Sequence, residues 1–147
     1  MKVVTADPKE TARVAADFAK KMKGGEVVAL IGDLGAGKTT FVQAFAKALG
    51  VRERVSSPTF VLMHEHHLAE STVNGQRSTV RALVHADAYR ADAAQFRNIG
   101  IEEYFGAPGT VVLIEWADRV EALLPKKRLT IRFRHLGGDR REIVVPS

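Results

Sequence analysis

Two short runs of apolar residues stand out because neither alternates with polar residues nor follows the spacing of a helix. Residues 26–31 read Glu-Val-Val-Ala-Leu-Ile, and residues 111–114 read Val-Val-Leu-Ile. Such short runs are typical of parallel strands that are covered on both faces. We therefore predict two central strands of a buried sheet at these positions.

Helical spacing follows the first of these runs. Between Lys38 and Leu49 the apolar residues recur every three or four positions, and Gly50 stands where a helix C-cap belongs. An earlier helix is expected to begin at Asp7-Pro8, with Asp7 as N-cap, and to end at Gly24-Gly25. A third, short helix is predicted over residues 118–124, with Asp118 and Glu121 in capping-box positions and a proline after it.

The remaining apolar stretches predict strands over residues 2–5, 60–64, 80–85, 129–133 and 142–145. A turn at Asn74-Gly75 favours a hairpin between the second and third of these, and residues 137–139 favour a closing hairpin between the last two. Hairpins pair their strands in antiparallel fashion, whereas strands joined by helices pair in parallel. The pattern therefore predicts an α/β fold with a mixed central sheet.

Composition restricts the class of protein. The chain has 147 residues, about the size of one domain, and we expect residues 1–147 to form a single domain. It has no cysteine, no signal-peptide pattern at its start and no apolar run long enough to span a membrane, so we expect a cytoplasmic location. Lys and Arg exceed Asp and Glu by 22 to 17, but the excess is scattered, which favours a solvated surface over a nucleic-acid footprint.

A phosphate-binding motif joins the first central strand to the helix after it. Residues 32–39 read Gly-Asp-Leu-Gly-Ala-Gly-Lys-Thr, which matches the P-loop pattern G-x-x-x-x-G-K-[ST]. In this pattern glycines let backbone N–H groups point at the phosphates, and the helix N-terminus adds its positive dipole. A glycine-rich turn that only links strand and helix is the alternative, which the correct flanking elements disfavour.

The motif assigns roles to its residues. The Lys38 ammonium, at the outer start of the helix, is expected to bridge the β- and γ-phosphates of ATP, and the Thr39 hydroxyl to bind Mg²⁺. Thr40 is a further polar contact, and the backbone of Gly35, Ala36 and Gly37 is expected to cradle the phosphates. The sequence therefore predicts a P-loop NTPase-type three-layer domain with ATP and Mg²⁺ as its ligands.

Two acidic residues follow predicted strands. Glu115 ends the run at 111–114, so it is expected at the carboxyl edge of a parallel sheet, where it could bind Mg²⁺. Asp87 follows the predicted strand 80–85 and could orient water or the metal's surroundings. An exposed strand-end glutamate and a simple turn aspartate are the alternatives. Arg90 and Arg119 could neutralise phosphate charge, although ordinary salt bridges are an equal alternative.

Three further motifs accompany the P-loop: Ser57-Pro58-Thr59-Phe60, His85-x-Asp87-x-Tyr89-Arg90 and Ile114-Glu115-Trp116. In this order the four motifs resemble the TsaE family, a small P-loop ATPase needed to form threonylcarbamoyladenosine in tRNA. The likeness runs from about Glu10 to Pro125. It departs from the family at Ala88, where a bulky residue is usual, and over residues 64–79, where the family has a short hairpin.

The resemblance implies further roles. Thr39 and Glu115 would bind Mg²⁺, Asp87 would belong to the catalytic surroundings, and Thr59 would face the γ-phosphate from a switch-like loop over residues 57–60. Thr11 would lie near the adenine, and Arg140 would match a late arginine of the nucleotide site. Partners would be the tRNA-modification proteins of the TsaD and TsaB type, with direct contact to tRNA left open.

Other functions remain in competition. A small P-loop kinase is one alternative, although no arginine-rich lid is visible in 147 residues. A nucleotide-dependent binding subunit with little hydrolysis is another. A GTPase is disfavoured because the chain has no Asn-Lys-x-Asp segment to bind guanine. His64, His66 and His67 suggest a metal site, but a solvated hairpin edge is favoured because no acidic partners are arranged around them.

Overall fold

The computed structural model describes residues 1–32, 37–55, 62–68, 72–73 and 76–146. A mixed sheet of seven strands in the order β1-β9-β8-β2-β7-β6-β3 forms its centre. The strands are β1 (Lys2–Thr5), β2 (Val27–Gly32), β3 (Met63–His67), β6 (Ala82–Asp87), β7 (Thr110–Glu115), β8 (Leu129–Gly137) and β9 (Arg140–Val144). The separate pair β4 (Thr72–Val73) and β5 (Gln76–Arg77) flanks Asn74-Gly75, which lies outside the described residues.

Strand direction divides the sheet into a parallel centre and antiparallel edges. β2 pairs in parallel with β7 and β8, and β6 pairs in parallel with β7. β3 runs antiparallel to β6, and the β8–β9 hairpin pairs antiparallel with β1. The predicted mixed sheet and the closing hairpin are therefore confirmed, and this hairpin is longer than its sequence pattern indicated.

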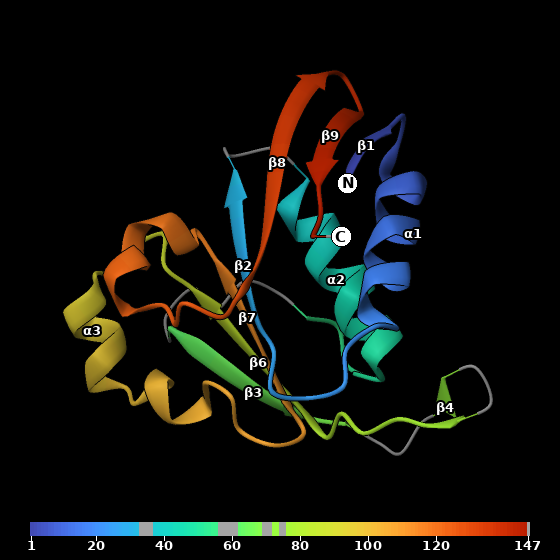
Figure 1. Cartoon of the computed structure of the whole chain (residues 1–147). Helices are drawn as coiled ribbons and strands as arrows, with labels where there is room; N and C mark the ends of the chain where they lie inside the picture. Colours follow the sequence, from blue (N-terminus) through green and yellow to red (C-terminus); the bar gives the residue numbers. More distant parts are fainter. Residues whose placement is uncertain (33–36, 56–61, 69–71, 74–75, 147) are drawn as a thin grey trace.

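Helices cover both faces of the sheet (Figure 1). On one face lie α1 (Pro8–Ala19) and α2 (Lys38–Leu49), whose apolar residues share a core with alternate residues of the strands. On the other face lie α3 (Ala93–Asn98) and the 3₁₀-helices η1 (Ile101–Tyr104) and η2 (Ala117–Leu123), which enclose a second core. This is the predicted three-layer arrangement, and α2 has the predicted bounds and C-cap, Gly50 at φ 114°.

Two predicted helices differ from the structure. α1 begins as predicted, with the Asp7 carboxylate accepting from the Glu10 N–H at 2.9 Å, but it ends at Ala19 rather than at Gly24-Gly25. Gly24 serves a close backbone crossing instead, since a Cβ there would lie 2.7 Å from the Gly109 Cα. The capping box predicted for Asp118 and Glu121 is wrong, because Trp116 is the N-cap of η2 without a side-chain bond and Glu121 pairs with Arg128.

The strand predicted at 80–85 lies two residues further along the chain, at 82–87. Of the strand predicted at 60–64, residues 60 and 61 lie outside the described residues, and β3 comprises Met63–His67. Asp87 closes β6, and the apolar pattern alone does not include this polar residue in the strand. The shift matters because Asp87 belongs to β6 itself and stands directly beside Glu115 of β7 in the parallel register.

Candidate active site

The N-terminus of α2 begins the candidate site. Gly37 is the N-cap, with a left-handed φ of 93°, and no side chain of the described residues caps the helix. Uncapped N–H groups at a helix start are the donors that bind phosphate in P-loops. Gly35 and Ala36 lie outside the described residues, so their predicted role stays a prediction. Gly32 ends β2 where β8 comes close, since a Cβ there would lie 2.8 Å from Phe133.

Lys38 is the first residue of α2, and it is buried, with 6% of its surface exposed. The expectation that it stands at the outer surface of the helix is therefore wrong. Its ammonium donates to the Gly32 carbonyl oxygen and lies 3.3 Å from the centroid of the Trp116 ring. A cation over an indole face gains on the order of 1 kcal/mol or more. The ammonium is thus held at the sheet edge beside the carboxylates described next.

Thr39 and Thr40 follow in the first turn of α2. Thr39 is exposed and Thr40 is half-buried. The predicted role of Thr39 in binding Mg²⁺ and that of Thr40 as a further polar contact stay predictions.

Asp87 and Glu115 come together at the carboxyl ends of two adjacent strands. They are register partners in the β6–β7 ladder, and Glu115 also stands opposite Leu30 in β2. Alternation along the strands puts both carboxyl groups on the face that α2 covers, because their neighbours Leu83, Leu113 and Leu30 pack in the α1–α2 core. Parallel β-sheets bind ligands at this edge.

The Glu115 carboxylate is buried and has a specific partner. Only 4% of Glu115 is exposed, and its Oε2 accepts from the His85 Nε2 at 2.6 Å. His85 is fully buried, and its Nδ1 has no hydrogen-bond partner in the described part of the chain. An exposed strand-end glutamate is therefore the wrong interpretation. Because a carboxylate can only accept, the hydrogen of this bond sits on Nε2.

Burial raises the pKa of the half-buried Asp87 carboxyl, and the nearby Glu115 charge raises it further. The Tyr89 N–H, which donates to Asp87 Oδ1 at 2.9 Å, His85 and Lys38 act in the opposite direction. The hydrogen bond from the Tyr89 N–H is the contact expected of an aspartate in a turn. The same carboxyl also interacts electrostatically with Lys38 and Glu115, so these groups share one site.

We expect Asp87→Asn to raise the melting temperature at pH 7, and to raise it less as the pH falls toward 3. Since the folded pKa is raised, the native state holds the Asp87 proton more tightly than the unfolded chain. The wild type therefore loses stability as the pH rises through this pKa, and asparagine avoids the loss. Thermal unfolding from pH 3 to 8 measures the effect. A gain that persists unchanged at the acidic end would contradict it.

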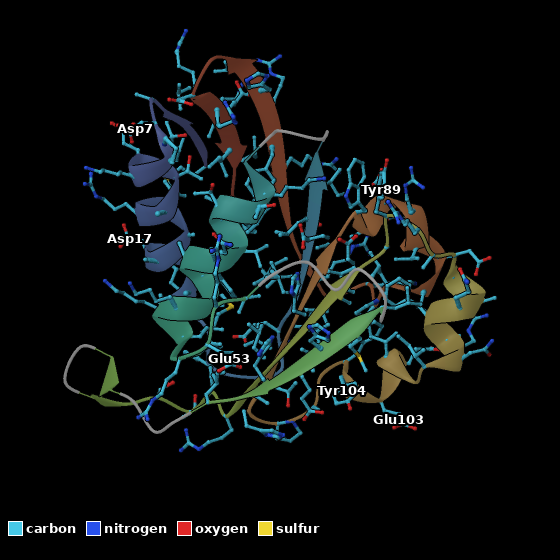
Figure 2. All side chains as sticks on the ribbon, turned by 180° about the vertical axis from the view of Figure 1, so that it is seen from behind. Asp7, Asp17, Glu53, Tyr89, Glu103 and Tyr104 are labelled. Atoms are coloured by element: carbon cyan, nitrogen blue, oxygen red, sulfur yellow. The ribbon has the colours of Figure 1, made fainter. Side chains whose placement is uncertain are left out.

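Aromatic and cationic side chains close the site beside η2. Trp116 has a left-handed backbone, φ 57°, that tryptophan rarely adopts, and its ring lies 4.9 Å from that of Tyr89, labelled in Figure 2. Arg119 donates to the Tyr89 carbonyl oxygen at 2.8 Å and lies over both rings. Arg90 is exposed. The turn after β7 therefore aims the Trp116 ring at the Lys38 ammonium.

Thr11 and Arg140 lie toward the β1–β9 side of the fold. Thr11 is buried, and its hydroxyl lies 2.8 Å from that of Thr5. Arg140 is exposed, whereas the next residue, Arg141, reaches α2, since a Cβ on Gly37 would meet the Arg141 Cγ at 3.4 Å. The predicted contacts of Thr11 and Arg140 with nucleotide stay predictions.

The sequence pattern missed Arg141, which lies near the site, and it missed the role of His85 as the partner of Glu115. His85 did carry a usable signal, because it stands two positions before Asp87 and shares its strand face.

Residues 57–60, including Thr59, lie outside the described residues. Among described residues no group of three or more His, Cys, Asp or Glu side chains is arranged to hold a metal. The expectation that the histidines have no acidic partners is wrong, because His66 bonds Glu53 at 2.5 Å and His67 lies 3.6 Å from Glu65.

Comparisons with known proteins identify the family. The sequence model described as "Threonylcarbamoyl adenosine biosynthesis protein TsaE" matches residues 5–143. The chain is 41% identical over 143 residues to the "tRNA threonylcarbamoyladenosine biosynthesis protein TsaE" of Bacillus subtilis, covering 97% of this chain and 83% of the relative. The protein of the same name from Treponema pallidum is 38% identical over 146 residues, 99% of each chain. The chain belongs to the TsaE family.

The structure of a relative agrees with this assignment. A crystal structure of the B. subtilis protein YdiB matches with a TM-score of 0.73 and 38% identity, over 97% of this chain and 82% of YdiB. The predicted P-loop-type α/β fold is thereby confirmed. The TsaE family takes part in the biosynthesis of threonylcarbamoyladenosine in tRNA, as the resemblance implied. No helix among the described residues is long and apolar enough to cross a membrane.

Proposed function

We propose that this TsaE-family chain is a Mg²⁺-dependent ATPase whose turnover drives or resets the proteins that form threonylcarbamoyladenosine in tRNA. The observation that carries the proposal is the meeting of Lys38, Asp87 and Glu115 at the N-terminus of α2. A buried cation, an uncapped helix start and two carboxylates at the carboxyl edge of a parallel sheet suit a magnesium nucleotide.

The donor set fits Mg²⁺ chemistry. Mg²⁺ prefers oxygen ligands and usually takes only one or two from carboxylates, with phosphates and water completing the shell. Thr39 and Glu115 offer such oxygens, and the described residues hold no larger cage of His, Cys, Asp or Glu side chains. When bound, Mg²⁺ would neutralise phosphate charge as hydrolysis proceeds.

The chain's own residues divide the remaining work. Lys38 would leave the Gly32 carbonyl and the Trp116 ring to bind the β- and γ-phosphate oxygens. Asp87, with its raised pKa, would accept a hydrogen bond from the attacking water and orient it. His85 would hold the Glu115 carboxylate in one orientation through the 2.6 Å bond. Thr59, outside the described residues, would act from the switch-like loop.

We propose that the protein acts in the cytoplasm together with partner proteins of the TsaD and TsaB type. Alone it would hydrolyse ATP slowly, and these partners would accelerate the reaction. The contacts of Lys38 support this proposal, because its ammonium must leave the Gly32 carbonyl oxygen and the Trp116 ring before it can bind a phosphate. A partner that stabilises the exchanged state would raise the rate of turnover.

Phosphate release by the purified protein tests the proposal. We expect slow, Mg²⁺-dependent release from ATP, little release from GTP, and at least roughly tenfold stimulation by TsaD- and TsaB-type proteins, the shift that about 1.4 kcal/mol of barrier provides. Trp116 is the only tryptophan of the chain, so its fluorescence reports nucleotide binding in the same samples. Binding without release under any condition would favour a binding subunit, and phosphate transfer to a small molecule would favour a kinase.

A further inference from the structure

The β1–β9–β8 part of the sheet has one face turned away from α1 and α2. Ile131 and Phe133 of β8 and Ile143 of β9 point into the α1–α2 core, so the residues between them point to the opposite face. The core on that side, among the described residues, draws its members from β2, β3, β6, β7 and the helical segments, not from β1, β8 or β9. Figure 1 shows these three strands beyond the helices of that layer.

Cationic side chains dominate this face, which we call the open sheet face. The side chains of Arg134 and Lys2 are 67% and 65% exposed, and Arg132 and Arg140 are exposed too. The face comprises Lys2 and Val4 of β1, Arg132 and Arg134 of β8, and Arg140, Glu142 and Val144 of β9. The sequence separates these cations widely, but strand pairing brings them onto one rigid surface.

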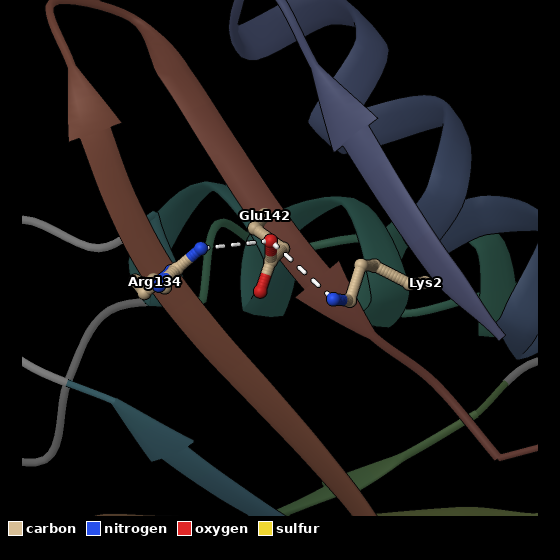
Figure 3. Close-up of polar contacts among 3 residues, drawn as sticks. All are labelled: Lys2, Arg134 and Glu142. Carbon is tan, nitrogen blue, oxygen red and sulfur yellow. Dashed lines mark hydrogen bonds and ion pairs between the residues drawn. The ribbon is translucent and has the colours of Figure 1, made fainter.

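One carboxylate stands among them. Figure 3 shows Glu142 between Arg134 and Lys2, with its Oε2 at 3.1 Å from the Arg134 Nη2 and 3.9 Å from the Lys2 ammonium. Glu142 is the least exposed of the three, with a side-chain exposure of 15%. A single carboxylate shared by two cations leaves positive charge in excess, and Arg132 and Arg140 add to it.

We propose that the open sheet face binds the phosphate backbone of RNA. Arginine, which supplies three of its four cations, presents a planar guanidinium that matches two phosphate oxygens at once. An antiparallel sheet holds such side chains in fixed rows, as a surface that follows a polyanion requires. The family's place in tRNA modification makes RNA the fitting polyanion. This inference does not depend on ATP hydrolysis.

The test measures binding of a fluorescently labelled, unmodified tRNA transcript by anisotropy at several salt concentrations. The double variant Arg132→Ala/Arg134→Ala is expected to bind at least roughly tenfold more weakly, with a salt slope smaller by about 1.4–1.8, as the loss of two phosphate contacts predicts. The variant Glu142→Gln is expected to bind more tightly than wild type, because it frees Arg134 and Lys2 from their shared carboxylate.

A matched control removes the same net charge elsewhere. Arg13→Ala/Arg97→Ala changes an exposed arginine on α1 and another on α3, where Arg97 is ion-paired to Glu102 at 3.3 Å much as Arg134 is to Glu142. We expect this pair to bind tRNA as wild type does. Melting temperatures and phosphate release of all three variants should stay near wild type, which separates a failure here from a failure of the ATPase proposal.

Three results would overturn the inference. An equal loss in the control pair would mean that only total charge matters. The absence of saturable tRNA binding by the wild type would remove the ligand. Normal tRNA binding by Arg132→Ala/Arg134→Ala together with lost binding to TsaD- or TsaB-type proteins would assign the open sheet face to an acidic protein surface instead.

Discussion

Lys38→Ala is expected to lower ATP hydrolysis by roughly 10²–10³-fold, the loss typical when one donor that stabilises transition-state charge is removed. The reason is specific to this site. Lys38 is buried and interacts electrostatically with the Asp87 carboxyl, so the variant removes the positive charge that would face the phosphates. Phosphate release under saturating Mg²⁺ and ATP measures the loss.

Burial of Lys38 gives the same variant a second effect. Alanine removes the donor to the Gly32 carbonyl oxygen and the cation over Trp116, so we expect a modest loss of stability, on the order of 1–2 kcal/mol. Lys38→Met is the matched control because it keeps most of the aliphatic stem without the charge. Both variants should lose hydrolysis, and Lys38→Met should lose less stability. Hydrolysis at the wild-type rate in either variant would refute the phosphate-loop assignment.

Local sequence signals predicted the helix α2 and the strands β2 and β7 well. Gly37, Gly50 and the spacing of Phe41 and Phe45 all act within α2 or at its ends, so the helix bounds follow from neighbouring residues alone. The all-apolar runs likewise located β2 and β7, because a strand buried on both faces needs apolar residues at every position. These features required no knowledge of how the chain folds back on itself.

The sequence did not predict the contacts that depend on pairing between distant segments of the chain. His85 meets Glu115 only because β6 lies next to β7, and the order of strands in a sheet is not written in either segment. The burial of Lys38 has a similar origin, since Trp116, the residue that covers it, lies far away in the sequence. The backbone of Trp116 is left-handed, a conformation that no propensity rule would assign to tryptophan. The site thus contains the features that local rules predict least.

Glu115→Gln is expected to raise the Mg²⁺ concentration for half-maximal hydrolysis by roughly 10²-fold or more, because it replaces a carboxylate oxygen that would bind the metal with a neutral amide. Glutamine has nearly the same size, so the packing of this buried side chain is kept. Its amide oxygen can still accept from His85, which preserves the hydrogen bond between these two side chains. Mn²⁺ binding in the presence of ADP, followed by electron paramagnetic resonance, measures metal affinity without turnover.

Substitutions of His85, the partner of Glu115, provide a second test of this metal-binding role. In the described part of the chain His85 makes no side-chain hydrogen bond other than the one to Glu115, so removing the donor should disturb the orientation of that carboxylate. His85→Leu is expected to weaken Mg²⁺ and Mn²⁺ binding by roughly 10–100-fold, the range found when the outer partner of a metal ligand is lost. His85→Gln can place an amide N–H near the position of Nε2, and we expect it to recover much of the affinity.

Nucleotide binding without metal separates the two possible roles of Glu115. Trp116 fluorescence titrated with ADP and EDTA should give similar affinities for wild type, Glu115→Gln and His85→Gln, because Lys38 and the helix N-terminus would hold the phosphates unaided. If Glu115→Gln left the Mn²⁺ affinity and the Mg²⁺ titration unchanged, Glu115 would serve only to satisfy the buried His85. Loss of metal affinity in Glu115→Gln and His85→Leu, with recovery in His85→Gln, would instead establish that His85 acts through the orientation of a metal-binding carboxylate.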